Sequence, residues 1–136
     1  MRAKRCVAVA AVGLLLAVVP VAAHHAFAAE FDKDQPVTVH GTVTKVEWVN
    51  PHAWLWVDVK GGDANVVSWS FEMGAPGVLL RRGFTKEAVK PGIEVVVDGY
   101  RAKSGLPVAS GRSVKLPDGR DLFAGAPAGD AADEKK

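Results

Sequence analysis

Cysteine is almost missing from this chain, whose 136 residues contain a single one, Cys6. It lies at the start of a long uncharged run and ahead of the apolar core, so it does not hold the position of a lipoprotein acylation cysteine. Once the segment that carries Cys6 is removed, the chain has no disulfide, no thiolate metal site and no cysteine nucleophile. We therefore expect the fold to be stabilised by apolar burial.

Sequence signatures of the common enzyme classes are also missing. The chain has no Gly-x-Ser-x-Gly, no His-Glu-x-x-His, no glycine-rich phosphate loop and no Ser-x-x-Lys. A pair of Asp or Glu side chains could still perform general acid-base chemistry, because pairing in space is invisible in a sequence. We expect a protein that is not an enzyme.

The N-terminal segment has the pattern of a secretory signal peptide over residues 1–23. A basic start precedes an uncharged run over residues 6–19, and small residues follow the break at Pro20. We expect cleavage after Ala23, with a second small-residue site after Ala28. An uncleaved anchor is the alternative, since the run approaches the length that spans a bilayer. Cleavage predicts a periplasmic or secreted protein.

An excess of positive charge is absent once this segment is set aside. Three of the 17 Lys and Arg residues lie within residues 1–23, and none of the 15 Asp and Glu residues does. The remainder therefore carries 14 basic and 15 acidic side chains, and the formal net charge changes from +2 to −1. Phosphate backbones and anionic lipids are attracted by positive fields. We expect no nucleic-acid partner and no stable membrane insertion after cleavage.

What the chain does contain is a series of alternating apolar and polar residues over residues 37–125, which predicts β-strands. In the first strand the apolar positions change parity at Thr44-Lys45, which predicts a bulge or bend. Asn50-Pro51 marks a turn. The second strand is expected to bury one row and turn the other away from the core: Ala53, Leu55, Val57 and Val59 inward, and His52, Trp54, Trp56 and Asp58 outward.

The rest of the domain completes a small all-β fold with one short helical segment. A third strand is expected to face the core with Val67, Trp69, Phe71 and Met73. Helical turns are predicted over 78–82, ending at Gly83, and over 85–89. Further strands follow at 93–100 and 108–116, with a short return at 122–123. This element order is typical of a small five-stranded barrel of the oligonucleotide/oligosaccharide-binding type (OB-like), with an open antiparallel β-sandwich as the alternative. Residues 24–36 are expected to be extended, and residues 126–136 to form a disordered tail.

Short motifs are spread along the chain: His24-His25 before Ala29-Glu30-Phe31-Asp32, Gly41-Thr42-Val43, Trp48-Val49-Asn50-Pro51-His52-Ala53-Trp54, Leu80-Arg81-Arg82-Gly83 and Gly99-Tyr100-Arg101-Ala102. Together they resemble a family of small exported bacterial proteins that is catalogued as a domain of unknown function. The resemblance covers roughly residues 23–125. It implies a periplasmic or secreted product and implies no set of catalytic residues.

Histidines are the first candidates for chemistry. Cleavage after Ala23 would make His24 the N-terminal residue, whose amine and imidazole can chelate one metal ion, with His25 adding a third nitrogen. Such donors suit Cu²⁺ above other late divalent ions such as Ni²⁺ and Zn²⁺. The alternative is a polar start compatible with export. His52 is a weaker candidate ligand, because a turn histidine bonded to the backbone is the commoner case, and His40 lies too far along its strand to join it.

The outward row of the second strand suggests another role. Trp54 and Trp56, with His52 beside them, could stack a sugar ring or hold a peptide or a partner protein, as exposed aromatic side chains on barrel faces do. The alternative is that the N-terminal segment or the helix covers them. The sequence thus predicts an exported, non-catalytic binding or accessory module with two candidate sites, a metal site at the N-terminus and an aromatic face on the barrel.

Overall fold

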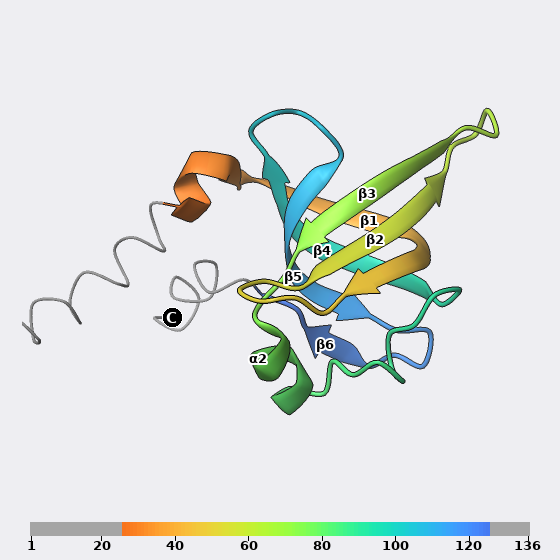
Figure 1. Ribbon diagram of the computed structural model, residues 1–136. Helices are drawn as coiled ribbons and strands as arrows, with labels where there is room; N and C mark the ends of the chain where they lie inside the picture. The colour runs from red at the N-terminus through yellow and green to blue at the C-terminus, as the bar shows by residue number, and fades with distance from the viewer. Residues whose placement is uncertain (1–25, 126–136) are drawn as a thin grey trace, which may run out of the picture.

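The computed structural model describes residues 26–125. It contains six strands, with one short helix between the third and the fourth (Figure 1). The elements are β1 (Phe31–Glu47), β2 (Trp54–Lys60), β3 (Val66–Glu72), α2 (Pro76–Arg81), β4 (Glu94–Ala102), β5 (Val108–Lys115) and β6 (Asp121–Phe123). The prediction of an all-β fold with one short helical segment is confirmed. The expected signal peptide, His24 and His25, and the tail 126–136 lie outside the described residues.

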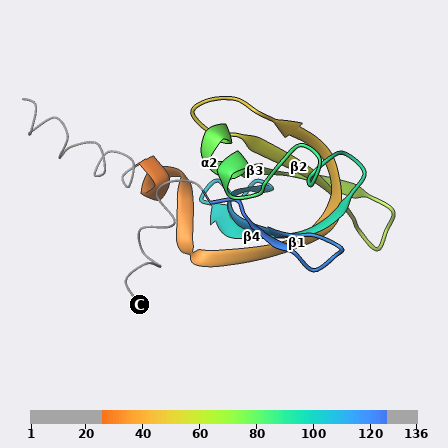
Figure 2. The ribbon, with the colours of Figure 1, turned by 90° about the horizontal axis from the view of Figure 1, so that it is seen from below.

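The strands form one sheet in the order β3-β2-β1-β4-β5-β6, in which β3 also pairs with β5 in parallel. The sheet therefore curls into a ring from β1 through β2, β3, β5 and β4 back to β1 (Figure 2). The predicted short return at 122–123 is β6, which pairs with β5. The 17-residue β1 pairs with both β2 and β4 and bends around the ring. Its register with β2 shifts between Val43 and Lys45, which confirms the predicted bulge.

The core lies inside this ring. Ala53, Leu55 and Val57 are each 0% exposed, as the alternation in β2 predicts. Phe71 of β3 and Met73, which directly follows β3, are buried as expected, and Trp69 is half-buried against the core. The prediction for Val67 is wrong, because this side chain is 45% exposed. The parallel pairing with β5 begins only at Ser70, and the hairpin of β2 and β3 projects beyond it, so no strand covers this part of β3 (Figure 1).

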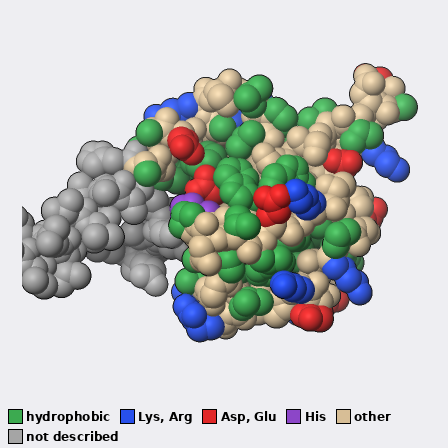
Figure 3. Space-filling view, in the orientation of Figure 1, with side chains coloured by type: hydrophobic (Ala, Val, Ile, Leu, Met, Phe, Trp, Pro, Cys, Tyr) green, Lys and Arg blue, Asp and Glu red, His purple; other side chains and the backbone are tan. Residues whose placement is uncertain are grey.

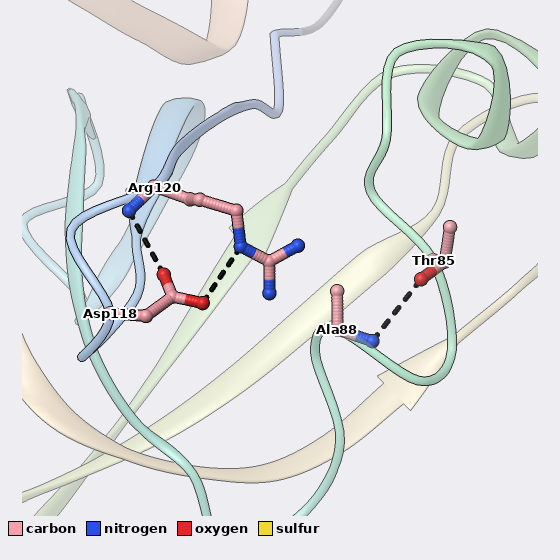
Figure 4. A network of polar contacts seen from close by, with 4 residues as sticks. All are labelled: Thr85, Ala88, Asp118 and Arg120. Atoms are coloured by element: carbon pink, nitrogen blue, oxygen red, sulfur yellow. Dashed lines mark hydrogen bonds and ion pairs between the residues drawn. The ribbon is translucent and has the colours of Figure 1, made fainter.

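The connections on either side of β4 and β5 are fixed by local hydrogen bonds. Helix α2 begins at Pro76, two residues before the predicted start, because proline is well suited to the first helical position. It ends before Gly83, whose φ is +89°. In the predicted turn 85–89, the Thr85 hydroxyl accepts a bond from the Ala88 N–H at 3.1 Å. In the turn before β6, Asp118 accepts bonds from the Arg120 backbone N–H and from its Nε at 3.0 and 2.8 Å (Figure 4).

The segment that leads into β1 lies against the rest of the domain. Residues 26–30 form a helical turn where extended chain was expected, and β1 begins at Phe31. The Phe27 ring lies 5.6 Å from the ring of Phe31 and 6.0 Å from that of Tyr100. The Lys103 ammonium donates a hydrogen bond to the carbonyl of Ala28 at 2.5 Å. The start of the described chain is therefore held at the end of β4.

Candidate functional site

The outer surface of β1, β2 and β3 gathers aromatic and charged side chains. Strand register places Trp54 between Glu47 of β1 and Glu72 of β3, and Trp56 between Lys45 and Ser70. Because paired residues in a sheet point to the same side, these six side chains share one face. With His52, they are called the tryptophan face below. Figure 3 shows hydrophobic side chains gathered over β2 and β3, with acidic, basic and histidine side chains around them.

The two indoles of the tryptophan face lie side by side. The ring centroids of Trp54 and Trp56 are 6.2 Å apart, and the ring planes are tilted by 37°. Both side chains are half-buried, so each keeps surface in contact with solvent. The Lys45 ammonium lies 4.9 Å from the centroid of the Trp56 ring and also forms an ion pair with Glu47. The face therefore presents an aromatic platform with a charged rim.

At the other end of the platform, the structure pairs His52 with a carboxylate. His52 Nδ1 lies 2.5 Å from Glu72 Oε1. Burial raises the pKa of the Glu72 carboxyl; the charge of His52 and its hydrogen bond oppose this rise, and the negative charge of Glu30 adds to it. Glu30 belongs to the helical turn 26–30, so the chain that follows His25 acts electrostatically on this end of the tryptophan face.

The partner of His52 differs from the one expected for a turn histidine, since it is a side-chain carboxylate and not the backbone. Residue 72 was not singled out from the sequence. The signal that could have found it is the register of the β2–β3 hairpin, which sets Trp54 opposite Glu72 and brings Ala53 into a hydrogen bond with Gly74. His52 is thereby carried to the end of β3.

The other histidines are not brought to this site by the described residues. His24 and His25 lie outside residues 26–125. His40 lines a separate groove, at the end of β2 that holds Lys60, so His40 and His52 do not share a site. Within residues 26–125, no group of three or more His, Cys, Asp or Glu side chains is placed to hold a metal ion.

No helix in that same range is both long and apolar enough to cross a membrane.

Comparison with known proteins gives the chain a family. Residues 11–111 match the model of a family of unknown function, DUF6152, and the chain belongs to that family. None of the curated proteins and none of the solved structures matches the chain. The chemistry of the tryptophan face therefore has to be argued from its own residues.

Proposed function

We propose that this protein is an exported, non-catalytic binding module that holds a sugar ring on the tryptophan face. The observation that carries the proposal is the pair of half-buried indoles, Trp54 and Trp56, set 6.2 Å apart on the outer surface of the ring of strands. Aromatic side chains that keep one surface exposed provide apolar contact area at little cost in side-chain entropy. Export is proposed from the signal-peptide pattern of residues 1–23.

The rim of the face suits hydroxyl groups. The carboxylates of Glu47 and Glu72 accept hydrogen bonds, and the Lys45 ammonium donates them. A sugar ring offers an apolar C–H side to an indole and hydroxyl groups at its edge, so it uses both the platform and the rim. A nucleic acid fits less well, because the same two carboxylates repel its phosphates.

The proposal predicts how tryptophan emission responds to sugars. Titration with maltose, cellobiose and diacetylchitobiose is expected to give a saturable change in emission with at least one of them. Trp54→Ala and Trp56→Ala should each remove that change. Trp48→Phe is the matched control, because Trp48 packs against Phe84 with ring centroids 5.9 Å apart and is not part of the tryptophan face. No saturable change with any of the three sugars, or equal binding by all variants, would contradict the proposal.

A second proposed function is transition-metal binding by His24 and His25, with Cu²⁺ as the favoured ion. What supports it is that the chain just after the two histidines is anchored by the hydrogen bond from Lys103 to the Ala28 carbonyl, while the negative charge of Glu30 raises the pKa of Glu72, the partner of His52. This electrostatic link to the His52–Glu72 pair makes His52 the candidate for a further ligand.

Native mass spectrometry of protein recovered from the periplasm of expressing cells tests this second proposal. The expected species begins at His24 and retains one copper ion, and a double His24→Ala/His25→Ala variant is expected to lose it. A metal-free chain that begins at Ala29 would refute it, since both histidines would then have been removed with the signal. The sugar proposal is unaffected by that outcome.

A further inference from the structure

A groove with a volume of about 450 Å³ lies outside the tryptophan face, where β1 runs between β2 and β4. Its lining includes His40 and Thr42 of β1 and side chains from β2, β4 and β5, and no tryptophan. This volume lies within the range of small-ligand sites, about 300–1,000 Å³. The site is called the β1 groove below.

Strand register sorts the charges of the β1 groove into two rows. In one row, Thr42 is paired with Asp58 of β2 on one side and with Glu94 of β4 on the other. This row is acidic at both ends.

The neighbouring row is basic. His40, two residues away along β1, is paired with Val96, which is itself paired with Lys115 of β5. Lys60 lies two residues beyond Asp58 on β2 and also lines the groove. Alternate residues of a strand share a face, and two residues span about 7 Å along it. The groove therefore presents carboxylates and ammonium groups in parallel rows about 7 Å apart.

These charges do not neutralise one another by direct contact. Among residues 26–125, the recorded ion pairs involve none of the four charged groups Asp58, Lys60, Glu94 and Lys115. Both rows are therefore open to a ligand that carries charges of both signs. A ligand of one sign would gain from one row and be repelled by the other.

We propose that the β1 groove binds a small zwitterion whose ammonium and carboxylate groups are about 7 Å apart, the length of an extended dipeptide. The ammonium group lies between Asp58 and Glu94, and the carboxylate lies between Lys60 and Lys115. The Thr42 hydroxyl and the His40 imidazole face the peptide unit between them and can hydrogen-bond to it. This site is separate from the tryptophan face, and no covalent step is involved.

Two-dimensional ¹⁵N NMR of the purified protein, titrated with glycylglycine, tests the proposal. Saturable shifts are expected at the backbone amides of the β1 groove, with the four indole N–H signals unchanged. N-acetylglycine, which lacks the ammonium group, and glycylglycinamide, which lacks the carboxylate, should each bind about tenfold more weakly, the size of one lost charge-assisted contact.

Variants assign the two ends of the ligand. Asp58→Asn/Glu94→Gln should weaken glycylglycine binding about tenfold and leave N-acetylglycine binding unchanged or stronger. Lys60→Gln/Lys115→Gln should weaken glycylglycine and N-acetylglycine alike. Glu87→Gln, an exposed carboxylate in the turn after α2, is the control and should bind normally. The spectra also report whether each variant is folded.

The proposal is overturned if glycylglycine at about 10 mM, roughly ten times a Kd of 1 mM, gives no saturable shifts in the groove. It is equally overturned if both double variants bind as the unmodified protein does. Because no tryptophan lines the β1 groove, failure here leaves the sugar proposal standing, and the reverse also holds.

Discussion

Replacement of Gly41 by alanine tests the close approach of β1 to β2, on which both the tryptophan face and the β1 groove depend. A Cβ atom at this position would lie 2.3 Å from the carbonyl oxygen of Asp58 and 2.7 Å from Cγ1 of Val57. The first neighbour is backbone and the second belongs to a fully buried side chain, so neither can move without parting the two strands.

The size of the effect follows from two opposing contributions. Overpacking of this kind lowers the unfolding free energy by about 1–3 kcal/mol. Replacing glycine by alanine also restricts the unfolded chain, which raises the unfolding free energy by about 0.4–1 kcal/mol. At the midpoints of these two ranges the net loss of unfolding free energy is about 1.3 kcal/mol, which corresponds to a fall in Tm of about 5–10 °C for a domain of roughly 100 residues. Thermal unfolding followed by circular dichroism measures it.

Gly62→Ala is the matched control for this prediction. Gly62 lies in the β2–β3 turn, and a Cβ added there meets no atom within 4 Å. The unfolding free energy of this variant should be within about 0.5 kcal/mol of that of the unmodified protein. If Gly41→Ala and Gly62→Ala unfold at the same temperature, the close approach of β1 to β2 is refuted.

Three further predictions concern single side chains. Leu55→Ala should lower the unfolding free energy by about 2–5 kcal/mol in urea titrations, because Leu55 is 0% exposed inside the ring. A loss below about 1 kcal/mol would mean that the Leu55 side chain lies outside the core. Val67→Ser should change it by less than about 0.5 kcal/mol, since the side chain is exposed, and a larger loss would argue for a covered hairpin. Burial raises the pKa of the Glu72 carboxyl in the folded state. The protonated carboxyl therefore contributes its full stabilisation below the pKa of the unfolded chain, and this stabilisation is lost as pH rises through the pKa of the folded state. Glu72→Gln should therefore gain stability relative to the unmodified protein as pH rises above the ordinary pKa of a glutamate, and an opposite trend in urea titrations would refute the shift.

Local patterns in the sequence were sufficient to predict much of the fold. The change of parity at Thr44-Lys45 located the bulge in β1, because period-2 alternation cannot continue through an extra residue. In the aliphatic row Ala53, Leu55 and Val57 are buried as expected and Val59 is half-buried against the core, because only one face of a strand with one apolar side can be turned inward. Gly83 correctly marked the end of α2.

Features that depend on pairing between distant strands could not be predicted in this way. Val67 continues the alternation of β3, yet its exposure depends on where the pairing with β5 begins. The contact between His52 and Glu72 follows from the register of the hairpin, not from either residue alone. The rows of the β1 groove require the pairing of Thr42 with Glu94, residues far apart along the chain. The sequence shows which charged residues are present, but it does not show which of them lie side by side in the folded sheet.

The central claim, that Trp54 and Trp56 form a platform for a sugar ring, is tested most directly by following the indole N–H groups themselves. The chain has four tryptophans, and each gives its own signal in a ¹⁵N NMR spectrum. During titration with the disaccharide that changes the emission most, the account predicts saturable shifts for Trp54 and Trp56 and unchanged signals for Trp48 and Trp69. Shifts confined to Trp48 or Trp69, or no saturable shift in any of the four, would contradict it.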